Sequence, residues 1–267
     1  MTESPLGGLA VDPAFDSQLG SSMEDVERYL RSTVVSDYPF VTETSRHLVD
    51  AGGKRFRPLL TLLASHFGPR PANDDVIKAA VVVELTHLAT LYHDDVMDEA
   101  QLRRGAPSAN ARWDNSVAIL TGDFLFARAS DILADLGPEA VRIQAQTFER
   151  LCTGQIREAV GPDDGIDPVK HHLQVLSDKT GSLIATAGRF GAMMAGAEAS
   201  TIDTLSRFGE AIGVAFQLAD DIVDITSDAE QSGKLPGTDL REGVPTLATL
   251  IAQATDQSGD DALVAFL

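Results

Sequence analysis

Apolar residues recur at helical spacing through most of this 267-residue chain, and few stretches alternate with the period of two that a half-buried strand requires. Gly-Pro pairs, which end helices readily, interrupt this pattern at 68–69, 137–138 and 161–162. The sequence therefore predicts an all-α fold, a single-domain bundle of many helices. A cap at Asn73, Asp74 or Asp75 would begin the first of four clearly expected helices. These helices cover residues 76–100, 116–137, 138–160 and 202–226.

The composition excludes several classes of protein. Acidic residues outnumber basic ones by 40 to 21, and a formal net charge of −19 argues against binding to nucleic acid. The single cysteine, Cys152, excludes an internal disulfide framework. We find neither a secretory signal nor a transmembrane segment, which needs roughly 20 apolar residues, and expect a cytoplasmic protein. Residues 1–20 resemble a loose leader, and 21–267 form the expected catalytic domain.

Three aspartates gather at the end of the first expected helix. Asp94 and Asp98 are four residues apart and share a helix face, and Asp95 flanks them. Like charges at this spacing destabilise a helix unless something cationic compensates them. Carboxylates in this arrangement suit Mg²⁺, which takes one or two protein carboxylates, waters and substrate phosphates. A solvated helix end remains the alternative interpretation.

The same spacing occurs a second time in "FQLADDIVDI", at Asp220, Asp221 and Asp224. This copy also ends an apolar helix, where the macrodipole already disfavours negative charge. Two copies in the same unfavourable setting indicate two walls of one metal-filled site that binds a phosphorylated substrate.

Basic residues concentrate beside glycines and beside the acidic motifs. The segment "AGGKRFRPLL" places Lys54, Arg55 and Arg57 before a helix expected to begin at Pro58, where free N–H groups attract anions. The alternative is a basic loop paired with the acidic surface. Further cations follow at Arg103, Arg104, Lys179 and Lys234. Arginine binds phosphate through two parallel hydrogen bonds, and lysine binds it as a point charge.

Together these motifs resemble the trans-isoprenyl diphosphate synthases of the polyprenyl synthetase family, above all the medium- and long-chain bacterial enzymes. The resemblance rests on the order of "GGKRFRP", "HDDVMDEAQLRRG", "KTG", "FQLADDIVDI" and "GKLPGTDLREG" along nearly the whole chain. It implies a helical fold around a deep central cavity, commonly in a homodimer. It also implies a prenyltransferase that condenses isopentenyl diphosphate with an allylic diphosphate. The product is passed on, in some cases to membrane enzymes.

The resemblance assigns roles to individual residues. The resemblance implies about three Mg²⁺ ions in each substrate-bound site. Carboxylate and phosphate oxygens are the ligands that Mg²⁺ prefers. The implied ligands of these ions are Asp94, Asp95, Asp98, Asp220, Asp221 and Asp224. These six aspartates and Lys179 are the implied catalytic residues. The residues that match the isopentenyl diphosphate positions are Lys54, Arg57, His87 and Arg104. The residues that match the allylic substrate positions are Arg103, Lys179, Thr180, Gln217 and Lys234. Without the resemblance, His87 would be interpreted as a buried structural histidine.

The implied mechanism needs no nucleophilic side chain. Metal ions and cations stabilise the departing diphosphate, an allylic cation forms, the isopentenyl double bond attacks it, and released pyrophosphate takes the proton. Cys152 is expected to be structural.

The length of the product should depend on the helix before Asp94. In the family, bulky residues four or five positions before the first aspartate stop chain growth, and here those positions hold Thr90 and Ala89. Val82, Thr86 and Ala89 form a stripe of small side chains on one helix face. This stripe predicts a medium or long product, whereas Tyr92, near the motif, argues for less room.

Several alternatives stay open. A short-chain synthase making farnesyl or geranylgeranyl diphosphate has the same motifs. Terpene cyclases share only the first motif, and regulatory subunits of heteromeric synthases tend to lose the aspartates that this chain keeps. Members of the family usually continue for dozens of residues beyond the position of Leu267, so we expect the final helices of the fold to be missing from this sequence.

Overall fold

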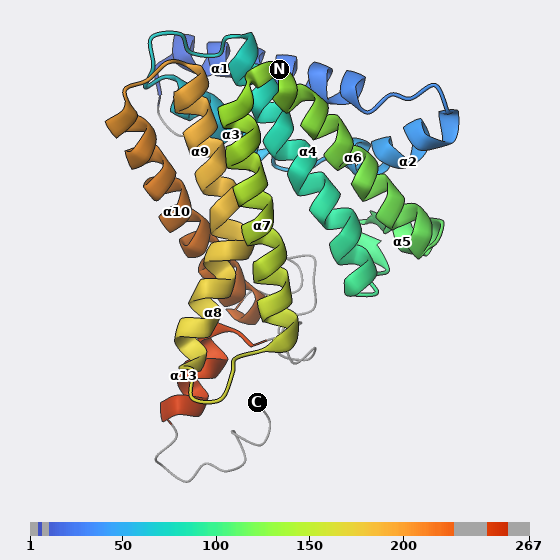
Figure 1. Ribbon diagram of the computed structural model, residues 1–267, viewed down its shortest axis with the longest axis vertical. Helices are drawn as coiled ribbons and strands as arrows, with labels where there is room; N and C mark the ends of the chain where they lie inside the picture. The colour runs from blue at the N-terminus through green and yellow to red at the C-terminus, as the bar shows by residue number, and fades with distance from the viewer. Residues whose placement is uncertain (1–4, 7–10, 227–244, 256–267) are drawn as a thin grey trace. The chain divides into compact units, whose positions relative to one another are not determined.

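The computed structural model describes residues 5–6, 11–226 and 245–255, and it is all-α apart from one two-residue hairpin in the described part (Figure 1). The elements in chain order are α1 (Pro13–Thr33), α2 (Pro39–Asp50), α3 (Phe56–Ser65), α4 (Asp74–Met97), β1 (Leu102–Arg103), β2 (Ala106–Pro107), α5 (Ala109–Arg112), α6 (Asn115–Leu136), α7 (Pro138–Val160), α8 (Pro168–Leu176), the π-helical turn η1 (Ser177–Gly181), α9 (Ser182–Met194), α10 (Ala199–Thr226) and α13 (Leu247–Thr255). The predicted fold class is confirmed.

The chain divides into two compact units. The first unit comprises Met1–Ala145 and Thr186–Arg207, and the second comprises Gln146–Ala185 and Phe208–Leu267. Helices α7, α9 and α10 therefore contribute residues to both units.

All four clearly expected helices are present, and their ends follow the caps. Asn73 accepts hydrogen bonds from the backbone N–H groups of Asp75 and Val76 at the start of α4, and Gly137 ends α6. Helix α3 begins at Phe56 and not at Pro58, which falls inside the first turn, where a missing N–H costs no hydrogen bond.

Helix α1 begins inside the segment expected to be a loose leader. The Asp12 carboxylate caps it by accepting from the backbone N–H groups of Ala14 and Phe15. Leu19, Val26 and Leu30 then form a fully buried stripe at helical spacing. The capping residue and the buried stripe together explain why the helix starts earlier than the sequence predicted.

Helix α4 is the central helix of the first unit. Its residues Val81, Val82 and Val83 are consecutive and completely buried, so neighbours cover it on all sides. It lies beside α6, as Figure 1 shows, and also contacts α3 and α1. Length and composition alone would let α4 cross a membrane, but 67% of its most apolar window is buried inside the protein. That burial is ordinary for a core helix.

Tyr92 links α4 to α2. Its hydroxyl donates to the carbonyl oxygen of Thr44 at 2.5 Å and accepts from the backbone N–H of Leu48 at 3.2 Å. The side chain is fully buried against α2. Burial also raises the pKa of the phenol above its ordinary value, so Tyr92 stays neutral and able to donate. This contact holds the end of α2, on which part of the candidate site is built.

Close packing of α9 on α3 predicts how two glycine substitutions differ. A methyl group on Gly191 would collide with the carbonyl oxygen of Thr61, whereas one on Gly20 in α1 would meet nothing within 4 Å. Gly191→Ala should lower the free energy of unfolding by about 2 kcal/mol or more. Gly20→Ala, the matched control, should raise it by about 0.5–1 kcal/mol. Urea unfolding followed by circular dichroism measures both, and equal effects would contradict the packing described.

Candidate active site

The first acidic motif lies where α4 ends, and its three aspartates have different environments. Asp95 is fully buried, Asp94 is half-buried, and Asp98 is exposed at the helix C-cap. The Asp95 Oδ1 atom accepts from Arg103 Nε at 2.6 Å, whereas the buried Oδ2 atom has no hydrogen-bond partner. Burial raises the pKa of Asp95, and the Arg103 guanidinium opposes this shift. Arg103 therefore fixes one oxygen of Asp95, and the other oxygen can accept a further ligand.

The hairpin after α4 gives two adjacent arginines different partners. Arg104 and Gly105 both have positive φ, 56° and 77°, as the tightest hairpin turns require. Arg103 pairs with Asp95, and Arg104 instead donates to the carbonyl oxygens of Leu48 and Gly52. The turn thus directs Arg103 to the Asp95 carboxylate and Arg104 to the backbone at the end of α2 and in the Gly52–Gly53 loop.

The Gly-Gly loop before α3 brings a group of cations together. Gly52 and Gly53 have φ of 85° and 136°, and a Cβ on Gly53 would lie 2.8 Å from the Arg104 guanidinium. Only glycine lets Arg104 come this close. Lys54 is exposed, and Arg57 is half-buried with its Nε atom lacking a hydrogen-bond partner. An anion is the partner that this arrangement suits.

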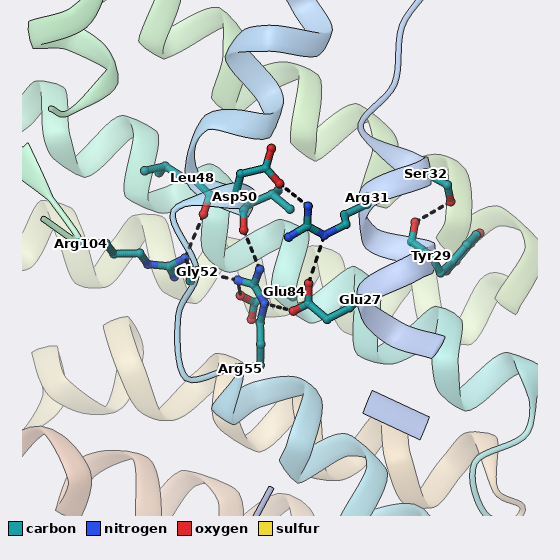
Figure 2. A network of polar contacts seen from close by, with 11 residues as sticks. Glu27, Tyr29, Arg31, Ser32, Leu48, Asp50, Gly52, Arg55, Glu84 and Arg104 are labelled. Atoms are coloured by element: carbon teal, nitrogen blue, oxygen red, sulfur yellow. Dashed lines mark hydrogen bonds and ion pairs between the residues drawn. The ribbon is translucent and has the colours of Figure 1, made fainter. Parts of the chain in front are cut away.

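Arg55 does not belong to that anion-binding group. The sequence placed it there with Lys54 and Arg57, but its side chain is buried and turns inward. It pairs with Glu27 and Glu84, as Figure 2 shows. Arg55 is the N-cap of α3 and has a left-handed φ of 47°, so it does not follow the regular helical spacing of Arg57.

His87 lies on α4, one turn after Glu84, among these arginines. Desolvation lowers the pKa of His87 well below its ordinary value, and Arg57, Arg104, Arg103 and Arg55 lower it further. The imidazole is therefore neutral near neutral pH and can donate one hydrogen bond without adding charge. The structure thus brings His87, Arg57 and Arg104 together, three of the four residues expected for one diphosphate.

The second unit holds most of the residues expected around the allylic substrate. Lys179 and Thr180 lie on η1, and π-helical turns occur frequently at functional sites. Lys179 Nζ pairs with Glu158 at 2.5 Å. Thr180 Oγ1 donates to Gln217 Oε1 at 3.3 Å, and Gln217 Nε2 donates to Asp221 Oδ1 at 3.3 Å. A continuous chain of hydrogen bonds therefore joins the KTG motif to the second acidic motif.

The middle aspartate of the second motif repeats the arrangement of Asp95. Asp221 is buried, its Oδ1 accepts from Gln217, and its Oδ2 has no hydrogen-bond partner. His172 Nε2 lies 3.7 Å from that oxygen and also lacks a hydrogen-bond partner. Asp220 is exposed. The side chain of Asp224 and the whole of Lys234 lie outside the described residues.

An ion-pair network around the buried Asp178 holds η1, and no sequence motif predicted it. Asp178 is buried and accepts from Arg150 Nε at 3.0 Å and from Arg157 Nη1 at 2.5 Å. Arg150 also donates to Ser177 Oγ at 3.0 Å and to Glu210 at 2.7 Å. The seven-residue spacing of Arg150 and Arg157 on α7 was the one signal that could have indicated a shared face.

The stripe expected to set chain length is buried. Val82, Thr86 and Ala89 are all fully buried, and Thr86 Oγ1 accepts from Gln144 Nε2 of α7 at 2.8 Å. Thr90 is half-buried, and Tyr92 is directed at α2. Tyr92 therefore contacts α2, whereas Thr86 of the stripe contacts α7. The chain-length role stays a prediction.

The acidic side chains fit a divalent metal only together with other ligands. In the ranges 11–226 and 245–255, no three His, Cys, Asp or Glu side chains converge on one metal position. The orphaned oxygens of Asp95 and Asp221 are nevertheless suited to a hard cation that keeps waters and binds phosphate. Because Asp95 and Asp221 belong to different units, the predicted opposition of the two motifs stays a prediction.

A pH-dependent stability should follow from the neutral state of His87. Its unfolded imidazole takes up a proton near pH 6.5, whereas the folded one stays neutral to a lower pH. Stability should therefore be complete above that value and fall as pH drops through it, by up to about 1.4 kcal/mol per pH unit. Urea unfolding between pH 7.5 and 5.5 measures this slope. In His87→Gln the slope of stability against pH should be smaller by the amount that corresponds to one proton taken up on unfolding. An unchanged slope would refute the assignment to His87.

Most of the chain is similar to known polyprenyl synthetases. The family model described as polyprenyl synthetase matches residues 38–265. The chain is 52% identical over 250 residues to nonaprenyl diphosphate synthase of Mycobacterium tuberculosis, covering 94% of this chain and 74% of that protein. It is 40% identical over 245 residues to heptaprenyl diphosphate synthase component 2 of Geobacillus stearothermophilus, covering 91% and 76%.

A solved structure has the same sequence identity to this chain as the nonaprenyl diphosphate synthase. Geranylgeranyl pyrophosphate synthase from Corynebacterium glutamicum, complexed with calcium and isoprenyl diphosphate, is 52% identical and superimposes with a TM-score of 0.85. The match covers 95% of this chain and 77% of that one.

Proposed function

The chain belongs to the polyprenyl synthetase family, and from this premise we propose that it condenses isopentenyl diphosphate with an allylic diphosphate into a medium- or long-chain all-trans polyprenyl diphosphate. The observation that carries this proposal is the repeated state of Asp95 and Asp221. In each unit a buried aspartate has one oxygen fixed by a hydrogen bond, while the other accepts none; His172 Nε2 lies 3.7 Å from that oxygen of Asp221. Such oxygens suit a metal that binds a diphosphate.

The metal site would be formed by both acidic motifs. Asp94, Asp95 and Asp98 would hold Mg²⁺ from one side, and Asp220, Asp221 and Asp224 from the other. Bound Mg²⁺ supplies Lewis-acid stabilisation to the charge that develops on the departing diphosphate. Magnesium is the proposed cation because the ligands are carboxylate oxygens that leave room for phosphate and water.

The allylic diphosphate would be held by Arg103 in the first unit and by Lys179, Thr180 and Gln217 in the second. Lys179 and Arg103 each have a carboxylate partner in the structure, Glu158 and Asp95, which keeps the two cations positioned. Their charges stabilise the diphosphate as the allylic carbon–oxygen bond breaks and the electron pair leaves with oxygen. Lys234, in the motif "GKLPGTDLREG", would be the last member of this group.

Isopentenyl diphosphate would bind Lys54, Arg57, His87 and Arg104. The unpartnered Arg57 Nε atom and the neutral His87 ring supply donors, and Arg104 supplies charge. The double bond of the bound molecule then attacks the allylic cation, a carbon–carbon bond forms, and a proton passes to the released pyrophosphate. Correct placement of this diphosphate therefore decides which carbon reacts.

A short-chain product is the second candidate. The geranylgeranyl pyrophosphate synthase and the nonaprenyl diphosphate synthase are equally similar to this chain, at 52% identity. The small side chains of Ala89 and Thr90 favour the longer product, because each additional isoprene unit needs space beside α4. We further propose a homodimer in the cytoplasm, and an assay of the purified chain alone separates an enzyme from a subunit of a heteromeric synthase.

Catalysis should require both the metal and the buried aspartate. Purified protein with isopentenyl diphosphate, farnesyl diphosphate and Mg²⁺ should form longer prenyl diphosphates, and chelation should stop the reaction until Mg²⁺ is restored. Asp95→Asn should lower kcat by at least about 100-fold, because neutral amides are poor Mg²⁺ ligands. Asp131→Asn, which removes an exposed carboxylate on α6, is the control and should leave kcat unchanged. Activity that survives chelation would refute the mechanism.

Product length should respond to bulk on α4. Ala89→Phe and Thr90→Phe place an aromatic ring at the fifth and fourth positions before Asp94, and one or both should shorten the product by at least one isoprene unit. Ala89 is fully buried whereas Thr90 is half-buried, so Thr90→Phe should perturb stability less. Chromatography of the dephosphorylated products measures length, and thermal unfolding monitors folding. Unchanged products from two folded variants would remove the chain-length argument.

A further inference from the structure

We propose that Glu84 and Arg55 are a positioning pair for the isopentenyl diphosphate site: they touch no substrate and hold Arg104, Arg57 and the Gly52–Gly53 loop in the geometry that binds the anion. This inference rests on the proposed function and adds two residues to it. The family motifs assign a role to neither residue. Both are identified by their contacts in the first unit (Figure 2).

Arg55 organises the backbone around the site. Its Nη1 atom donates to Glu84 Oε1 at 2.9 Å and to the carbonyl oxygen of Gly52 at 3.3 Å. Its Nη2 atom donates to the carbonyl oxygen of Val49 at 2.9 Å, and its Nε atom donates to Glu27. One buried side chain therefore ties α1, the end of α2, the loop and α4 together. Arginine is suited to this role because its five donors have a fixed planar arrangement.

Arg104 depends on the same backbone. It donates to the carbonyl oxygens of Leu48 and Gly52, and Gly52 is also an acceptor for Arg55. Figure 2 shows the two guanidinium groups reaching Gly52 from different directions. A shift of Arg55 would move this shared carbonyl and hence Arg104. The Gly52 carbonyl therefore couples a structural arginine to a substrate-binding one.

Glu84 supplies the counter-charge for the whole group. Its side chain is only 2% exposed, and it contacts Arg55 directly. Burial lowers the pKa of Arg57 and of Arg104, while the charge of Glu84 opposes both shifts. Cations gathered in a poorly solvated place repel one another, and a buried carboxylate makes that arrangement stable before the substrate arrives.

The arrangement leaves a donor available for the substrate. Arg55 uses its donors on Glu27, Glu84 and two carbonyl oxygens, whereas Arg57 Nε is buried and unpartnered. His87 follows Glu84 by one turn of α4, and burial, assisted by the same cations, lowers the pKa of its imidazole. Glu84 thus offsets the positive charge of the group through its contact with Arg55 and leaves the Arg57 Nε donor unpartnered.

The test is a comparison of Michaelis constants for the two substrates. Glu84→Gln should raise the KM for isopentenyl diphosphate by about 10- to 100-fold, the equivalent of one lost charge-assisted hydrogen bond. The KM for the allylic diphosphate should change by less than about threefold, because Glu84 contacts Arg55, which is not among the residues proposed to bind that substrate. Calorimetric titration of isopentenyl diphosphate into the Mg²⁺-loaded enzyme should show the same loss of affinity without turnover.

A matched control separates positioning from general destabilisation. Asp178→Asn also removes a buried carboxylate bound by two arginines, but it does so beneath Lys179 and Thr180. It should raise the KM for the allylic substrate and leave that for isopentenyl diphosphate nearly unchanged. Equal changes in both constants for both variants would overturn the proposal, as would an unchanged isopentenyl diphosphate KM in Glu84→Gln.

A second variant covers the case in which Glu84→Gln does not fold. Arg55→Met combined with Glu84→Leu replaces the ion pair with apolar groups of similar size, a change that is often neutral for stability. This double variant should fold and still show the raised isopentenyl diphosphate KM. A folded double variant with wild-type constants would refute the positioning role. If the wild-type enzyme instead showed no condensation at all, the proposed function would fail first.

Discussion

Cations held close together are stabilised by a fixed negative charge, and in each unit a buried carboxylate provides one. In the first unit Glu84 compensates Arg55 and the neighbouring arginines. In the second, Asp178 binds Arg150 and Arg157. Such pairs contribute little net stability, because desolvation offsets most of the attraction, yet removing one partner leaves the other charge buried and unpaired. Their effect is to fix geometry, and the geometry they fix carries the candidate substrate-binding side chains.

The same two carboxylates hold backbone conformations that the chain would otherwise disfavour. Arg55 has a left-handed φ of 47° and Arg104 one of 56°, while Ser177–Gly181 forms a π-helical turn. Each departure from regular geometry costs free energy and persists only where its surroundings determine it. In the first unit, contacts from Arg55 to two carbonyl oxygens determine the loop. In the second, the contacts of Arg150 with Ser177 and Asp178 determine the turn. Strain is therefore located beside the residues that we propose bind the two diphosphates.

Helices and motifs were predictable because both depend on local spacing, whereas the roles of individual cations were not. Arg55 and Arg57 stand two residues apart in one basic motif, yet one is a buried structural residue and the other has an unpartnered donor. A positive φ at Arg55 breaks the periodicity on which a face assignment relies. Glu84 was detectable in principle, since an acid within a long apolar run must find a buried partner. Its partner comes from 29 positions away, which local patterns do not specify.

The middle aspartates have the environment that the proposed metal-binding role needs before a metal arrives. A buried carboxylate without any donor would raise its own pKa and become protonated, and a protonated group is a poor metal ligand. A carboxylate whose two oxygens both accept hydrogen bonds has fewer lone pairs left for a metal. In Asp95 and Asp221, Arg103 and Gln217 each donate to one oxygen, and the other oxygen accepts no hydrogen bond. Since the two donors come from different elements and differ in charge, the same half-satisfied state arises twice by different means, which indicates that the state itself is what the site requires.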